Sequence, residues 1–261
     1  MKHFSLVLGG WAARGIAHIG VIRRLEELDM EPTAIVGTSI GALVWACYAC
    51  GYTSSEMSEI AHDVPFLKLL DIDMKTGSLK WEKLIKYLEK YFGEKTFRDT
   101  DIPLTIIATD IDTGEKYTFR EWKIIDAIRA SIGIPGIFRP YKYDGRMLVD
   151  GGLVANLAIE EAPSDSPVIA VSVQIELSKV KRSPRGLIFP NGTPVTHAYG
   201  MIRKTLAIMM ARNENASLAL HNNTLLIRPG RPEIEYYDFR KVDALIEAGY
   251  IASEPISSFL I

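Results

Sequence analysis

A glycine–serine–glycine turn between two apolar runs is the feature that most constrains how this chain folds. The turn is Gly37-Thr38-Ser39-Ile40-Gly41; apolar residues 33–36 precede it, and the apolar, helix-compatible residues 42–50 follow it. This order predicts a strand, a sharp turn with a serine at its apex, and a helix, which is the context of a nucleophile elbow. Gly37 and Gly41 are expected where the strand and helix backbones nearly touch, because a Cβ atom would not fit there. A Thr-Ser helix cap is the alternative interpretation of the same residues.

The composition is that of a soluble globular protein: 48% of the residues are hydrophobic and 24% are charged. A net charge of −2 gives no electrostatic reason to expect nucleic-acid binding. The two cysteines, Cys47 and Cys50, lie in the apolar run after the turn and are expected to be small core residues. The first apolar run stops at Gly9-Gly10, too early for a signal peptide, and no run is long enough to span a membrane. We therefore expect a cytoplasmic protein that can meet a membrane surface.

Buried strands that alternate with helices predict an α/β fold with three layers, α/β/α, around a central and mainly parallel sheet. We expect a single domain over residues 1–261. Strands are expected at 4–8, 33–36, 104–108, 116–119, 147–149, 168–173 and 224–227, with Asp150 at the end of the fifth. Helices are expected at 14–28, 42–50, 56–62, 79–91, 124–130, 197–220 and 241–248.

A serine nucleophile needs a base, and the sequence offers two kinds. Among the five histidines, only His197 and His221 follow the chain order Ser…Asp…His, and neither stands in a local catalytic motif. Asp150 ends an apolar run and precedes Gly151-Gly152, where it fits either an ordinary turn or an active-site edge of the sheet. A partly desolvated aspartate gains proton affinity and can accept a serine proton. From the residues alone, both bases stay open.

A second glycine-containing loop, Gly9-Gly10-Trp11-Ala12-Ala13-Arg14-Gly15, follows the first expected strand. Consecutive glycines at a strand-to-helix junction leave backbone N–H groups free to bind an anion. One interpretation is a dinucleotide phosphate loop, but G-x-G-x-x-G is not present, and the second strand leads into Gly37-Thr38 without an acidic residue. The other interpretation is an oxyanion hole beside Ser39, formed by two neighbouring strand-to-helix turns.

Taken together, these motifs resemble the bacterial patatin-like phospholipase family. The landmarks cover about residues 4 to 160, and the last hundred residues match only loosely. They are the glycine loop with Arg14-Gly15 and its continuation to residue 21, the early G-x-S-x-G, residues 108–114, residues 130–140, and Asp150-Gly151-Gly152.

The resemblance implies a patatin-like α/β/α fold and a Ser–Asp dyad hydrolase that cleaves acyl esters of lipids, of the phospholipase A or carboxylesterase type. Ser39 would form the acyl-enzyme and Asp150 would be the general base. The oxyanion hole would lie in the loop of Gly9, Gly10, Trp11 and Ala12. The substrate would be a phospholipid or another acyl-ester lipid, and neither a metal nor a cofactor is implied. The resemblance does not give the oligomeric state.

Two departures from the family pattern stand out. Trp11 replaces a glycine, and a positive φ at that position would cost this residue on the order of 1–2 kcal/mol. The alternative function is then a catalytically impaired lipid- or acyl-binding protein. Ala158 stands where proline is common, which is expected to affect local rigidity alone.

Two further expectations concern charge. Arg14 is expected to have a structural role at the start of the helix that follows the loop. Residues 185–190, an apolar stretch with basic residues on its N-terminal side, are expected to make peripheral membrane contact. A lid over the active site, or a loop packed on the helix after residue 197, is the alternative for this stretch.

Overall fold

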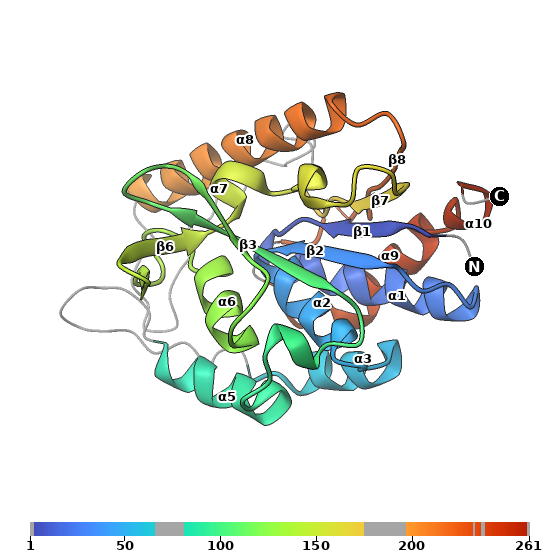
Figure 1. Cartoon of the computed structure of the whole chain (residues 1–261), viewed down its shortest axis with the longest axis horizontal. Coiled ribbons are helices and arrows are strands. Elements are labelled where there is room, and N and C mark those ends of the chain that lie inside the picture. Colours follow the sequence, from blue (N-terminus) through green and yellow to red (C-terminus); the bar gives the residue numbers. More distant parts are fainter. Residues whose placement is uncertain (1–2, 66–80, 175–196, 232, 236–237, 260–261) are drawn as a thin grey trace.

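A computed structural model describes residues 3–65, 81–174, 197–231, 233–235 and 238–259 (Figure 1). They form one eight-stranded sheet in the order β5-β6-β3-β2-β1-β7-β8, with β4 paired to β3 outside this path. Five strands pair in parallel: β1 (Ser5–Leu8), β2 (Ala34–Thr38), β3 (Leu104–Asp110), β7 (Val168–Val171) and β8 (Thr224–Ile227). Antiparallel pairing adds β4 (Lys116–Phe119), β5 (Tyr141–Tyr143) and β6 (Arg146–Asp150).

Helices cover both faces of this sheet, so the expected three-layer α/β/α arrangement with a mainly parallel sheet is confirmed (Figure 1). One face carries α7 (Gly152–Ala155) and α8 (His197–Ala219). The other carries α1 (Ala17–Glu27), α2 (Ile40–Ala49), α3 (Ser54–Asp63), α5 (Glu82–Phe92), α6 (Ile124–Ser131) and α9 (Val242–Ala252). Shorter elements are the 3-10 turns η1 (Ala12–Ile16), η2 (Phe97–Asp99) and η3 (Ile159–Glu161), and α10 (Ile256–Phe259) near the C-terminus.

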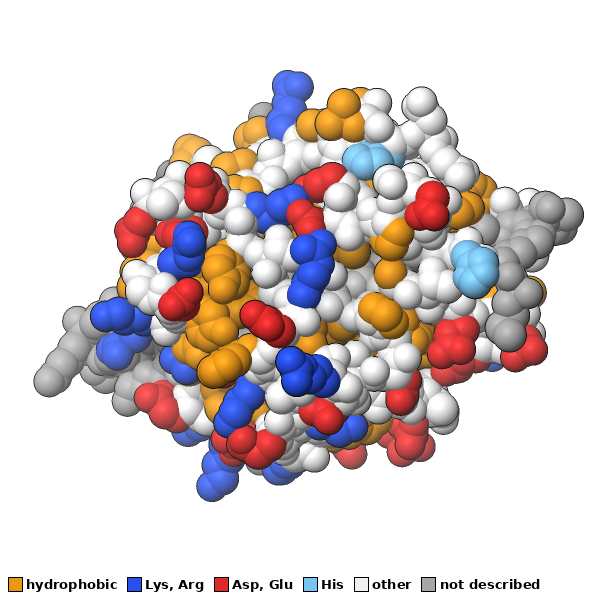
Figure 2. Space-filling model, in the orientation of Figure 1, with side chains coloured by type: hydrophobic (Ala, Val, Ile, Leu, Met, Phe, Trp, Pro, Cys, Tyr) orange, Lys and Arg blue, Asp and Glu red, His pale blue; other side chains and the backbone are white. Residues whose placement is uncertain are grey.

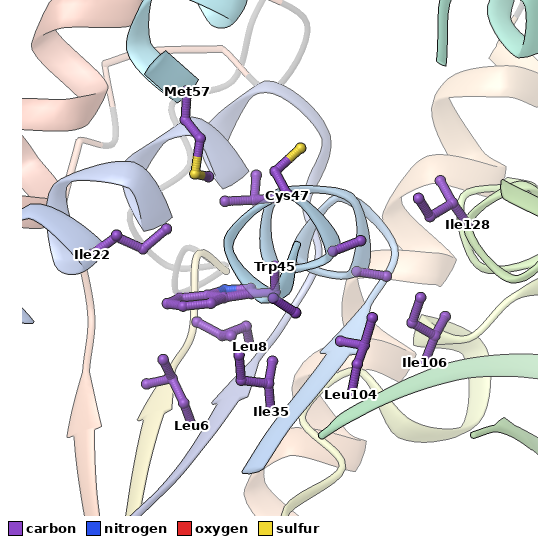
Figure 3. Close-up of a cluster of buried hydrophobic side chains, with 14 of the residues drawn as sticks. Leu6, Leu8, Ile22, Ile35, Trp45, Cys47, Met57, Leu104, Ile106 and Ile128 are labelled. Atoms are coloured by element: carbon purple, nitrogen blue, oxygen red, sulfur yellow. The ribbon is translucent and has the colours of Figure 1, made fainter. Parts of the chain in front are cut away.

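The central strands divide their side chains between two cores, because successive residues of a strand point to opposite faces. Val7, Val36 and Ile107 pack in the smaller core, together with residues of α7 and α8. The larger core fills the opposite face. There Trp45 of α2 is fully buried and lies over Leu8 of β1 (Figure 3). The sheet is thus buried on both faces at the strands that lead into the glycine loop and the serine turn.

The cysteines behave as expected for core residues. Cys47 is buried in the larger core, and Cys50 is partly buried at the end of α2. Burial raises the pKa of the Cys47 thiol to about 12, so this group stays protonated and unreactive at neutral pH.

The helix expected at 14–28 is divided in the structure. It begins as the 3-10 turn η1 and becomes α-helical at Ala17. In this tighter turn, Gly15 packs directly against Ile40, the first residue of α2. A Cβ atom at Gly15 would lie only 2.3 Å from Cγ2 of Ile40. The path of the glycine loop is therefore set by contact with the serine turn.

The surface seen in Figure 2 intersperses Lys and Arg with Asp and Glu, and no side-chain charge of one sign dominates this face. Ion pairs such as Lys116–Glu160 at 2.7 Å and Arg120–Glu161 at 2.6 Å neutralise charge locally. Within the described residues, no helix has both the length and the apolar character needed to cross a bilayer.

Candidate active site

Ser39 stands at the turn between β2 and α2, as the sequence predicts for a nucleophile elbow. Its φ of 56° and ψ of −129° lie in a region that residues other than glycine rarely adopt. Such a conformation costs about 1–3 kcal/mol and persists where the surrounding structure imposes it. The side chain is buried, so the strain is held at a site removed from bulk water.

The two glycines of the motif allow the backbones to meet around Ser39. A Cβ atom at Gly37 would lie 2.7 Å from Cα of Ala42, and one at Gly41 would lie 2.6 Å from the carbonyl oxygen of Leu8. The steric reason predicted for these glycines is therefore confirmed.

Ser39 and Asp150 are joined by a short hydrogen bond. The Oγ of Ser39 donates to Oδ2 of Asp150 at 2.6 Å, and both side chains are buried. The second carboxylate oxygen, Oδ1, accepts the backbone N–H of Gly152 at 2.8 Å. Each carboxylate oxygen of Asp150 thus has a hydrogen-bond donor, and one of these donors is the hydroxyl group at the strained turn.

Asp150 ends a strand outside the parallel part of the sheet, because β6 runs antiparallel to β3. Asp150 pairs with Ala108, one residue further along β3 than Ile107, the partner of Thr38 in β2. The aspartate lies beside the serine because of this register.

The environment of Asp150 adjusts its acidity. Burial raises the pKa of Asp150 to about 6, against the opposing effect of the hydrogen bonds from Ser39 and the N–H of Gly152. The group is therefore ionised at neutral pH and yet basic enough to exchange a proton near that pH, as a general base requires.

Ser131, at the end of α6, holds the backbone of Ser39 in place through a hydrogen bond. Its Oγ accepts the backbone N–H of Ser39 at 2.7 Å and donates to the carbonyl oxygen of Ile107 at 2.6 Å. Sequence reasoning noted the stretch 130–140 as a block but gave Ser131 no role. The sequence shows only a serine at the end of an apolar helical run, which is too weak a signal to identify its partners.

The glycine loop passes directly over the nucleophile. A Cβ atom at Gly10 would lie 2.3 Å from Cβ of Ser39, so the close approach needs glycine. Two N–H groups of this loop are already paired: Gly9 donates to the carbonyl of Val171 at 3.0 Å, and Gly10 donates to Oδ1 of Asn156 at 3.0 Å. Among the described residues, no acceptor takes the N–H of Ala12.

Comparison with known proteins identifies the family. A model of the patatin-like phospholipase family matches residues 6–163, more than half of the 261 residues. An NTE family protein of Mycobacterium tuberculosis, named as uncharacterised, is 34% identical over 211 residues, which are 78% of this chain and 57% of the relative. This chain belongs to the patatin-like phospholipase family. The resemblance inferred from the motifs is confirmed.

Two solved structures share this patatin-like fold. VipD from Legionella pneumophila matches all of this chain and 67% of its own, with a TM-score of 0.55 and 15% identity. ExoU from Pseudomonas aeruginosa matches 98% of this chain and 53% of its own, with a TM-score of 0.52 and 15% identity. At such identities the likeness shows the fold.

The chain spans about half the length of the curated relatives it matches. A second NTE family protein of Mycobacterium tuberculosis is 27% identical over 97% of this chain but only 46% of its own length. The expectation of one domain over residues 1–261 stays a prediction.

Trp11, which replaces a glycine of the patatin-like pattern, does not carry the positive φ considered for that position. Trp11 has a φ of −168°, extended backbone that any residue adopts, so the strain expected there is not found. The positive φ falls instead on Ala12, at 45°. The reason is the turn into η1, which begins at Ala12, one residue after the extended segment.

Arg14 and Gly152 are placed in structural roles. The guanidinium of Arg14 is buried, and its Nε and Nη2 donate to the carbonyl oxygen of Ile234 at 3.0 and 2.8 Å. Arg14 thereby ties the glycine loop to a segment near the C-terminus. Gly151 and Gly152 follow β6, and Gly152 contributes the N–H that holds Asp150.

The histidine alternative gains no support from the geometry. The hydroxyl of Ser39 donates to Asp150, while Nδ1 of His221 lies 2.8 Å from the carbonyl oxygen of Ser217. His197 begins α8, but its side chain is outside the described residues, as are residues 185–190 of the expected membrane contact.

Proposed function

We propose that this chain hydrolyses acyl esters of lipids through a Ser39 acyl-enzyme, with Asp150 as the general base. The observation that carries the proposal is the 2.6 Å hydrogen bond from Ser39 Oγ to Asp150 Oδ2, made at a buried turn with a positive φ. A nucleophile activated by an adjacent base in a strained, fixed position is the arrangement that acyl transfer requires.

The reaction follows in two halves. Ser39 Oγ attacks the ester carbonyl carbon while its proton passes to Asp150 Oδ2. The tetrahedral intermediate then collapses, the bond to the alcohol breaks, and Asp150 returns the proton to the leaving oxygen. In the second half, Asp150 takes a proton from water while the water oxygen attacks the acyl carbon. The bond from that carbon to Ser39 Oγ then breaks, Asp150 returns the proton to Ser39 Oγ, and the fatty acid is released.

The developing oxyanion is held by the glycine loop in this proposal. The N–H of Ala12 is the donor that the geometry favours, since Gly9 and Gly10 donate to Val171 and Asn156. A preorganised backbone donor contributes about 3–4 kcal/mol to transition-state stabilisation. This is a narrower assignment than the loop of four residues expected from the sequence.

The lipid substrate is supported by the family and by its named members. The human patatin-like phospholipase domain-containing protein 6 is 27% identical over 94% of this chain, which matches 20% of that protein. Peripheral membrane contact through residues 185–190 is part of the proposal, on the basis of their apolar and basic sequence. The alternative is an impaired lipid- or acyl-binding protein, because Trp11 replaces a loop glycine. The extended φ of Trp11 argues against backbone strain as its cause, and steric blocking by the indole is tested with Trp11→Gly.

The test compares the intact protein with Ser39→Ala, Asp150→Asn and the double variant His197→Ala/His221→Ala. Hydrolysis of p-nitrophenyl esters of increasing chain length and of a phospholipid in vesicles is measured, together with fluorophosphonate labelling. Loss of hydrolysis in Ser39→Ala and Asp150→Asn, with activity kept in the histidine variant, supports the dyad. Full activity in Ser39→Ala overturns the proposal. Activity that survives Asp150→Asn but not removal of the histidines overturns the choice of base.

A further inference from the structure

The peptide unit between Gly9 and Gly10 is clamped from both sides by buried side chains. Its carbonyl oxygen, on Gly9, accepts a hydrogen bond from Nε2 of His18 at 2.8 Å. Its N–H, on Gly10, donates to Oδ1 of Asn156 at 3.0 Å. His18 belongs to α1 and Asn156 is the C-cap of α7, so the clamp joins elements on opposite faces of the sheet. Rotation of this peptide unit breaks both hydrogen bonds and leaves buried polar groups unpaired, which is costly.

On the first side, His18 serves as a neutral donor. The ring is fully buried, and burial lowers its pKa to about 4. A carbonyl oxygen only accepts hydrogen bonds, so the proton of the neutral ring stands on Nε2, facing Gly9. His18 therefore fixes the direction of the Gly9 carbonyl without adding a charge.

On the second side, the orientation of Asn156 is set by a buried carboxylate. Its Nδ2 donates to Oε1 of Glu214 at 2.7 Å, and Oε2 of Glu214 accepts from the hydroxyl of Ser172 at 2.7 Å. Asn156 and Ser172 are fully buried, and Glu214 is 1% exposed. Because a carboxylate accepts and an amide NH₂ donates, Nδ2 must face Glu214 and Oδ1 must face Gly10. A flipped amide would place its NH₂ against the N–H of Gly10.

This chain of contacts ends at the reacting atoms. Gly10 passes so close to Ser39 that a Cβ atom on it would lie 3.0 Å from Ser39 Oγ, and Ala12 follows two residues later. We propose that His18, Asn156 and Glu214 are positioning residues that hold the oxyanion loop in its active conformation over Ser39. This inference rests on the proposed hydrolase function. Glu214 lies in α8, beyond residues 6–163 of the family match, so the C-terminal part of the chain helps to build the site.

The experiment uses Asn156→Ala, Glu214→Leu and Glu214→Gln in the full chain. The matched control is Asn213→Ala, which removes a hydrogen bond of 2.7 Å from the neighbouring residue of α8 to the carbonyl of Leu153 and does not touch the loop. Each variant is assayed with a p-nitrophenyl ester and with its thiono analogue, whose C=S sulfur gains little from an oxyanion hole. Thermal melting reports whether each variant is folded.

We expect Asn156→Ala and Glu214→Leu to lower kcat for the oxygen ester by about 10- to 100-fold, with KM within about twofold, because a displaced donor loses transition-state stabilisation. The ratio of oxygen-ester to thiono-ester rates should shrink by a similar factor. Glu214→Gln should keep kcat within about threefold, since its Oε1 still accepts from Asn156 and the Ser172 hydroxyl can rotate to pair with the new amide. Asn213→Ala should keep both kcat and the ratio.

The inference is overturned if folded Asn156→Ala or Glu214→Leu keeps the kcat and the rate ratio of Asn213→Ala. It is also overturned if the rates for both esters fall equally, which indicates a general structural defect. Where Glu214→Leu does not fold, Asn156→Ala decides alone, because it removes the direct partner of the Gly10 N–H and places no apolar side chain beside Ser172. Failure of the proposed function has a different signature: Ser39→Ala itself stays active.

Discussion

The Oγ of Ser39 and Oδ2 of Asp150 lie 2.6 Å apart in a buried site, although 111 positions separate the two residues in the chain. The carboxylate is paired with the hydroxyl group that it is proposed to deprotonate. Burial places the pKa of this carboxyl group at about 6, two units above the ordinary value for aspartate. This relationship makes both activity and stability depend on pH, in opposite directions.

Activity should rise with pH through the pKa of Asp150. Below about pH 6 the carboxyl group is protonated and cannot accept the serine proton, so kcat/KM falls about tenfold per pH unit and levels off above pH 7. The measurement is p-nitrophenyl ester hydrolysis by the intact protein from pH 4.5 to 8.5, corrected for spontaneous hydrolysis. The His197→Ala/His221→Ala variant should give the same profile. A flat profile between pH 5 and 7 would contradict a base with this pKa.

Asp150→Asn should stabilise the fold at pH 8 while removing activity. The pKa is higher in the folded state than in the unfolded chain, so the favourable contribution of the protonated acid is present below about pH 4 and lost as pH rises through 6. Two pKa units at 1.36 kcal/mol each correspond to about 3 kcal/mol of free energy of unfolding. Urea denaturation at pH 8 and pH 4 should show the gain at pH 8 alone. Equal stability of the two proteins at pH 8 would argue against a buried charge.

Ser131→Ala should slow catalysis by disturbing the serine turn. The variant leaves the N–H of Ser39 and the carbonyl of Ile107 without their shared partner, at a cost of about 2–3 kcal/mol in stability. We expect kcat to fall about tenfold or more, because the backbone conformation of Ser39 loses one of its restraints. The control is Ser5→Ala. Ser5, at the start of β1, is also fully buried, and its hydroxyl donates a hydrogen bond to Oγ of Ser166 at 3.0 Å. Ser5→Ala should cost stability but keep kcat; equal kcat losses would remove the specific role of Ser131.

Local patterns in the sequence account for most of the elements of the fold. Leu6, Leu8 and Ile35 face one core while Val7 and Val36 face the other, and such continuous apolar runs predict strands buried on both faces. The pairing direction of β6 could not be predicted in the same way. Whether Asp150 lies beside Ala108 in an antiparallel or a parallel pair depends on contacts between distant segments, not on the composition of either one.

The same distinction explains which site residues the sequence indicates. Ser39 and Asp150 stand in local motifs whose glycines make the turns recognisable. Ser131, Asn156 and Glu214 act through partners 24 or more positions away, and no local pattern in the sequence indicates those partners. The residue with the positive φ in the glycine loop could not be predicted from the sequence either. It is Ala12 instead of Trp11, because the backbone path from β1 into η1 determines which residue makes the turn.

The backbone of Ala12 and Trp11 yields a prediction that separates strain from steric blocking. Ala12→Gly should raise the free energy of unfolding by about 0.5 kcal/mol, because relief of the positive φ exceeds the added entropy of the unfolded chain. Trp11→Gly should lower it by about 1 kcal/mol, because Trp11 is already extended and glycine gains nothing there. Urea denaturation of both variants measures these differences, and ester hydrolysis should stay unchanged or fall in Trp11→Gly. A tenfold or greater rise in hydrolysis by Trp11→Gly would show that the indole obstructs the oxyanion loop, and would return the impaired lipid-binding protein as the better account of this chain.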